Sequence, residues 1–175
     1  LKFTALTTSP WAASAQGEVV SAVNFNSPGQ VVIAGAKAAV ERAIEGCKAR
    51  GAKRALPLPV SVPSHCELMR PAAERFAESV AAINWQAPQI PLVQNVSAAV
   101  APDLETLKRD LLEQLYKPVR WVESVQTLAA NGATQLVECG PGKVLAGLNK
   151  RCAEGVSTSN LNTPDAFAAA RAALA

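Results

Sequence analysis

A proline-rich apolar run, Ala55–Met69, constrains the fold of this 175-residue chain most strongly, and it contains the only histidine. Its prolines exclude a helix, and apolar residues alternate with smaller or polar ones over residues 56–62, which predicts an extended strand at a sheet edge. His65 then lies where this strand gives way to a helix. Such junctions often carry catalytic groups in α/β proteins, although a lone histidine is also often a packed or solvated residue.

From residue 17 onward, strand-like and helix-like patterns alternate. Two strands are expected at residues 19–25 and 30–34, joined by a tight turn in which Gly29 adopts a positive φ. The later patterns predict helices over 36–47, 69–83, 104–115, 121–131, 144–148 and from Pro164, and strands at 90–93, 134–137 and 158–161. Residues 18–62 therefore predict most of a ferredoxin-like unit, and the stretch after residue 66 predicts a doubly wound α/β core.

Composition excludes several function classes. The net charge of +3 is too small to indicate a nucleic-acid partner, and aromatic residues, at 5%, are too few for base stacking. No apolar run approaches the ~20 residues of a membrane span, and the first 16 residues lack a secretory signal, so we expect no membrane partner and a cytoplasmic location. The chain does not begin with methionine, which indicates a start inside a larger reading frame or after processing.

The cysteines are widely spaced, and only one histidine is present to join them. They predict neither a disulfide framework nor a metal site, and reduced thiols fit a cytosolic protein. Cys66 is a weak candidate for a nucleophile, because the sequence shows no cationic pocket that would lower the pKa of its thiol. No serine has the Gly-x-Ser-x-Gly context of an α/β nucleophile either.

Two further motifs each have two interpretations. The turn Gly140–Lys143 opens a helix, and it is either an anion-binding turn or a strand-to-helix turn that needs two glycines. A basic run is either a solvated face or a surface that steers an acidic protein or a phosphorylated carrier. The residues of this basic run are Lys48, Arg50, Lys53 and Arg54.

Four blocks of the chain, taken in order, resemble the bacterial malonyl-CoA:acyl carrier protein transacylases. They are Val23–Gly35 (VNFNSPGQVVIAG), Pro57–Met69 (PLPVSVPSHCELM), Gln114–Trp121 (QLYKPVRW) and Glu138–Leu145 (ECGPGKVL). The resemblance implies an α/β fold, with an incomplete ferredoxin-like small subdomain at residues 17–62 and part of an α/β-hydrolase-like, doubly wound acyltransferase core at residues 63–175. Residues 1–16 depart from the resemblance and stay unassigned.

The resemblance also implies a ping-pong acyl transfer of type-II fatty acid synthesis. A serine takes malonyl from coenzyme A and passes it to the phosphopantetheine thiol of acyl carrier protein, so the coenzyme A thioester is a substrate and no permanently bound cofactor is expected. By motif, His65 matches the family's general base, and Gln114 matches the residue whose backbone carbonyl orients that imidazole. Asn26 and Asn95 match polar residues near the substrate pocket, and the basic run resembles the region proposed to meet acyl carrier protein.

Three functional groups of the family are not found in this chain. The family's amino-terminal half carries the serine in Gly-His-Ser-Leu-Gly, an oxyanion-hole glutamine and an arginine that pairs with the malonyl carboxylate, and this sequence has none of them. We therefore expect the missing half as a partner, an inactive isolated chain and an uncovered apolar sheet edge. Two alternatives stay open: a non-catalytic truncated product that binds carrier protein, and an acyltransferase domain of a polyketide synthase.

Overall fold

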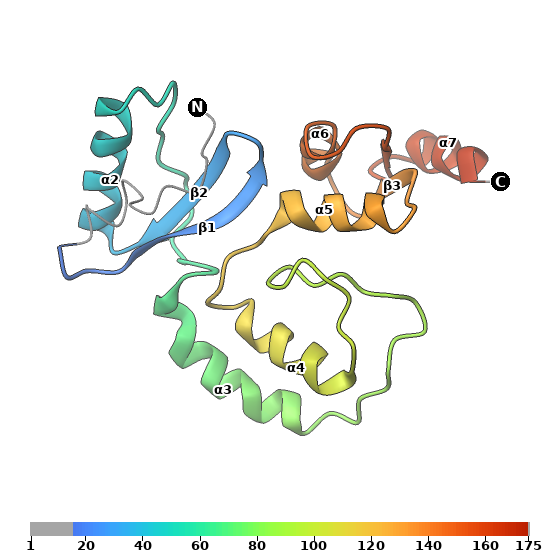
Figure 1. Cartoon of the computed structure of the whole chain (residues 1–175), viewed down its shortest axis with the longest axis horizontal. Coiled ribbons are helices and arrows are strands. Elements are labelled where there is room, and N and C mark those ends of the chain that lie inside the picture. The colour runs from blue at the N-terminus through green and yellow to red at the C-terminus, as the bar shows by residue number, and fades with distance from the viewer. Residues whose placement is uncertain (1–15, 175) are drawn as a thin grey trace.

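A β-hairpin covered by one helix forms the first part of the structure, a computed structural model that describes residues 16–174 (Figure 1). β1 (Val20–Ser27) and β2 (Gln30–Gly35) pair antiparallel, and Gly29 in the turn has φ +77°, as predicted. α2 (Lys37–Ala49) packs on the hairpin. The buried core between them consists of Val20, Ala39 and Ala43. The segment 1–16 that was expected to be atypical lies outside the described residues, apart from its last residue.

The segment after α2 does not form the predicted strand. Residues 52–64 follow an irregular path, and the apolar side chains of the run are exposed, from 53% at Val62 to 70% at Val60. The prolines of the run offer no N–H to a neighbouring strand, and the amides of Val60 and Ser64 donate to carbonyls two residues earlier, at 2.8 and 2.9 Å. The predicted strand over residues 56–62 is therefore wrong, because no strand in the described part of the chain lies beside this segment.

Three helices form the middle of the chain. A short 3₁₀ turn, η1 (Glu67–Met69), leads into α3 (Arg70–Ala81), which has Pro71 in its first turn, as predicted. α4 (Leu104–Glu113) packs beside α3, and Asp103 caps it as predicted, because its carboxylate accepts a 2.7 Å hydrogen bond from the Thr106 amide. α5 (Trp121–Ala130) follows. None of the helices within residues 16–174 is both long and apolar enough to cross a lipid bilayer.

A small parallel sheet lies near the carboxyl end. β3 (Gln135–Glu138) pairs with β4 (Ser157–Asn160), α6 (Val144–Asn149) lies in the connection between them, and α7 (Pro164–Leu174) follows β4. Both strands lie within one residue of their predicted positions. The strand predicted at residues 90–93 is wrong, since only Val93 makes an isolated bridge, to Val100. Pro91 removes one backbone donor there, and Ile90 is 79% exposed.

β1 connects the hairpin to the rest of the molecule. The Phe25 N–H donates to the Val119 carbonyl at 2.9 Å, and the Val119 N–H donates to the Val23 carbonyl at 2.8 Å. The residues just before α5 therefore run beside β1, parallel to it. Figure 1 shows the consequence, with the hairpin between α2 and α5.

Candidate active site

His65 is held at two points by the carboxyl end of α4. Its backbone N–H donates to the Leu115 carbonyl at 3.0 Å, and its ring Nδ1 lies 2.5 Å from the Gln114 carbonyl oxygen. Because a carbonyl oxygen only accepts hydrogen bonds, this contact requires a proton on Nδ1, and in the neutral ring the lone pair of Nε2 is then free to accept another. The structure thus brings His65 and Gln114 together.

The backbone of His65 is itself in an uncommon conformation. Its φ of +63° lies in the left-handed region, which costs a residue with a side chain about 1–2 kcal/mol. Residues in such conformations cluster at functional sites, where the surrounding contacts over-determine them. The two hydrogen bonds to α4 supply such contacts here.

The sequence around residue 118 explains why both acceptors are available. In a continuing helix the Gln114 carbonyl would accept from residue 118, but Pro118 has no N–H. The Leu115 carbonyl would accept from Val119, whose N–H is already bonded to β1. Both carbonyls are therefore open to His65. Read by itself in the sequence, Pro118 indicates only that the helix ends. Because it lies four residues after Gln114, however, it also indicates that the Gln114 carbonyl has no helical hydrogen-bond donor.

Asn95 belongs to the same cluster. Its side-chain Nδ2 donates to Gln114 Oε1 at 3.2 Å, and its backbone carbonyl accepts from the Arg120 N–H at 3.0 Å. The Arg120 guanidinium donates to the Ser97 carbonyl at 2.9 Å and also to Glu123, and the latter bond lowers the pKa of the Glu123 carboxyl. No local sequence pattern identifies Arg120, because its partner Ser97 lies 23 residues away.

Asn26 and Cys66 do not join this hydrogen-bonded cluster. The Asn26 carbonyl accepts a hydrogen bond from the Cys152 thiol at 3.5 Å, and within residues 16–174 no hydrogen bond connects Asn26 to His65, Gln114 or Asn95. Cys66 is fully buried, and its thiol faces the backbone carbonyl of residue 34 at 3.7 Å. Its sulfur is therefore closed to a substrate in solution.

The basic run lies at the end of α2 and in the segment that leads to His65. Lys48 is paired with Glu45 at 2.8 Å. The side chains of Arg50, Lys53 and Arg54 are exposed, and they form no ion pair with other described residues. Three positive charges of the run therefore have no ion-pair partner in the described part of the chain.

At the turn Gly140–Lys143, a carboxylate of the chain itself occupies the amides at the start of the following helix. The Glu138 carboxylate accepts hydrogen bonds from the Leu145 and Ala146 amides, at 3.1 and 2.8 Å. These amides begin α6, a helix of only six residues. The structure therefore favours the interpretation of a strand-to-helix turn over an anion-binding turn, with Gly140 and Gly142 both at positive φ.

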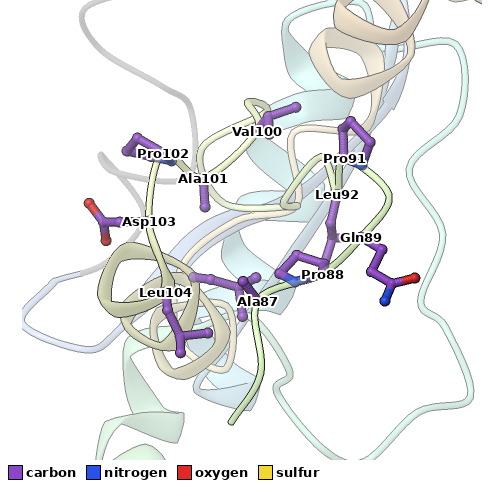
Figure 2. A pocket seen from close by; sticks show the side chains of 11 residues that line it. Ala87, Pro88, Gln89, Pro91, Leu92, Val100, Ala101, Pro102, Asp103 and Leu104 are labelled. Atoms are coloured by element: carbon purple, nitrogen blue, oxygen red, sulfur yellow. The ribbon is translucent and has the colours of Figure 1, made fainter.

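A hollow of about 270 Å³ lies at the other end of α4 (Figure 2). Its walls come from residues 87–92 and from residues 100–107, which include the first turn of α4. Asp103 lines it, but its carboxylate is engaged in capping the helix. The hollow is lined by none of the residues in the His65 cluster, so it contributes no group to the chemistry of that cluster.

The chain belongs to a family of acyltransferases. The sequence profile of the family described as "Acyl transferase domain" matches residues 4–165, so the match begins within the first 16 residues and earlier than the resemblance noted above. The malonyl CoA-acyl carrier protein transacylase of Salmonella typhimurium is 57% identical over 157 residues, which cover 90% of this chain and 51% of that protein.

Solved structures agree with this assignment. The chain superposes on malonyl-CoA:acyl carrier protein transacylase from Xanthomonas oryzae with a TM-score of 0.91 at 49% identity, covering 94% of this chain and 52% of the other. It also superposes, with a TM-score of 0.89 at 51% identity, on a malonyl-transacylase in complex with a type II polyketide synthase acyl-carrier protein, covering 92% of this chain and 52% of that one.

These comparisons confirm the resemblance to the bacterial transacylases and the fold class. The chain is part of an α/β-hydrolase-like core together with part of a ferredoxin-like small subdomain. It spans about half the length of the relatives that it matches.

Proposed function

We propose that this chain supplies the general base of a malonyl-CoA:acyl carrier protein S-malonyltransferase, whose nucleophilic serine lies in an amino-terminal half that this sequence does not contain. The contact between His65 Nδ1 and the Gln114 carbonyl is the observation that supports this most strongly. It fixes the tautomer in which Nε2 accepts a proton, as a general base requires. The 57% identity to a transacylase supports the choice of substrates.

In this proposal His65 moves one proton back and forth. Nε2 takes the proton of the serine hydroxyl while the serine oxygen attacks the thioester carbonyl of malonyl-CoA. The carbon–sulfur bond breaks, and the imidazolium returns the proton to the coenzyme A sulfur. In the second half-reaction Nε2 takes the proton of the phosphopantetheine thiol, the sulfur attacks the malonyl ester, and the serine oxygen regains a proton as it leaves.

The remaining assignments follow from the same proposal. Residues 63–175 form the core part, and residues 17–62 form the small subdomain, whose basic run docks the acidic acyl carrier protein. Asn26 lies near the malonyl pocket, as Asn95 does. We assign the reaction to type-II fatty acid synthesis in the cytoplasm, where the four free thiols of the chain stay reduced.

The role of His65 is tested in a fusion enzyme, defined as the amino-terminal half of the Salmonella typhimurium relative joined in front of this chain. We expect His65→Ala to slow malonyl transfer to acyl carrier protein by a factor on the order of 100 or more, because a general base is lost. Ser64→Ala, at the exposed neighbouring position, serves as the control and should stay within about two-fold. Near-normal transfer by the His65 variant would refute the role.

A further inference from the structure

We propose that Asn95 is a positioning residue, which holds Gln114 so that the Gln114 carbonyl stays in place against the His65 ring. This inference rests on the proposed function of His65. It assigns to Asn95 a role that acts through Gln114, instead of contact with the substrate. The first observation is the hydrogen bond from Asn95 Nδ2 to Gln114 Oε1, at 3.2 Å.

The position of Gln114 makes such support useful. Gln114 is the C-cap of α4, and helix ends fray more readily than helix interiors. The backbone of Gln114 is tied to the helix by its N–H, which donates to the Asp110 carbonyl at 3.0 Å. Its carbonyl has no helical partner, because Pro118 lacks the N–H. The bond from Asn95 therefore adds a second restraint to the residue that carries the carbonyl.

Asn95 can restrain Gln114 because its own turn is attached to α4. The preceding residue, Gln94, is buried, and its side chain donates to the Leu107 carbonyl at 3.3 Å. Leu107 and Gln114 are seven residues apart, about two helical turns, so they lie on the same face of α4. The two neighbouring side chains thus hold α4 at two points along one face.

The same turn is also attached to α5. Within the turn, the Ala98 N–H donates to the Gln94 carbonyl at 2.9 Å. From α5, Thr127 Oγ1 donates to the Ala98 carbonyl at 2.7 Å. At the start of α5, the N–H of Arg120 donates to the Asn95 carbonyl and its guanidinium to the Ser97 carbonyl. Residues 94–99 are therefore hydrogen-bonded both to α5 and to α4, and within this turn the side chain of Asn95 makes the contact with Gln114.

A double-mutant cycle in the fusion enzyme tests the inference. Asn95→Ala and Gln114→Ala remove the same hydrogen bond from opposite sides, and Gln114→Ala keeps the backbone carbonyl that His65 needs. We expect each to lower kcat by about ten-fold, with the KM for malonyl-CoA within about two-fold of its starting value, since one hydrogen bond contributes at most about that factor. The double variant should be no slower than either single variant.

Asn131→Ala is the matched control, because Asn131 is an exposed asparagine whose side chain also donates a hydrogen bond, in this case to the backbone carbonyl of Thr127 at 2.8 Å. Asn131→Ala should leave both kcat and the KM for malonyl-CoA unchanged. Unchanged kcat in Asn95→Ala would overturn the inference, as would effects that multiply in the double variant. A rise in KM alone would also overturn it and would make Asn95 a substrate contact. If Asn95→Ala fails to fold, Gln114→Ala carries the test.

A spectroscopic measurement separates this inference from the proposed function. His65 is the only histidine of the 175-residue chain, so a fusion enzyme ligated from an unlabelled amino-terminal half and this chain carrying ring-¹⁵N histidine gives imidazole signals from His65 alone. We expect a protected Nδ1–H proton in the unaltered fusion enzyme and in its Asn131→Ala variant, and faster exchange of this proton in the Asn95→Ala variant. This measurement needs no activity, so it applies even if His65→Ala leaves the fusion enzyme active. An Nδ1–H that is unprotected in the unaltered fusion enzyme, or equally protected in Asn95→Ala, would overturn the inference.

Discussion

His65 is fixed by its backbone and by its ring at the same time. The N–H and Nδ1 bond two successive carbonyls of one helix end, and the left-handed φ places both groups on that side. The motif in the sequence was sufficient to associate His65 with the Gln114 carbonyl. It was not sufficient to find Asn95 beside the Gln114 side chain, because that pair depends on how two segments 19 residues apart pack together.

At the same scale, the proposed docking of acyl carrier protein on the basic run gives a prediction. Reversing Lys53 and Arg54 to glutamate in the fusion enzyme should raise the KM for acyl carrier protein by about ten-fold and weaken the salt dependence of this KM, because both charges are exposed and, under the proposal, attract an acidic partner. Hydrolysis of malonyl-CoA should be unaffected. Reversal of the exposed Lys150 and Arg171 is the control, and equal losses of transfer and hydrolysis would argue against docking at this run.

At the scale of elements, the helices could be predicted and two of the strands could not. Apolar spacing and end signals are local, and the Asp103 cap and Pro71 in the first turn of α3 were both visible in the sequence. A strand also needs a partner, which no local pattern supplies. Residues 56–62 and 90–93 have apolar character but lie beside no strand in the described structure, and their prolines remove donors.

The α4 cap gives a prediction about stability. Asp103→Ala should lower the thermal stability of the fusion enzyme at neutral pH, and Asp103→Asn should largely preserve it, because asparagine caps a helix equally well. The bond from the Thr106 amide lowers the pKa of the Asp103 carboxyl below its ordinary value of 3.8. A carboxylate with a depressed pKa stabilises the fold above its unfolded-state pKa, and this stabilisation is lost as the pH falls through the folded-state value.

The parent should therefore lose its advantage in thermal stability over Asp103→Ala as the pH falls below about 3.8. The difference in thermal stability between Asp103→Asn and Asp103→Ala should not depend on this titration. Thermal unfolding followed by circular dichroism at several pH values measures both. An Ala variant as stable as the parent at neutral pH would show that the cap contributes nothing.

At the scale of the whole molecule, the described structure exposes an unusual amount of apolar surface. Leu56, Val60 and Ile90 are 63, 70 and 79% exposed, and the two sheets of the described residues have only two strands each. Parallel strands such as β3 and β4 occur almost only in sheets that are covered on both faces. Exposed apolar surface is thus present, but the residues named here lie in two irregular segments, around residues 56–62 and at residue 90, and not at the expected sheet edge. It suits coverage by the amino-terminal half that the proposed function requires.

Covalent labelling with radioactive malonyl-CoA tests most directly whether the base and the nucleophile lie in different halves. We expect no label on the 175-residue chain alone, and about one malonyl group per molecule on a serine of the amino-terminal half in the fusion enzyme. The label should pass to acyl carrier protein, and His65→Ala should suppress both steps. Stoichiometric labelling of a serine in the isolated chain would contradict the division of the site between two halves, and full labelling and transfer by the His65→Ala fusion would contradict the role of His65.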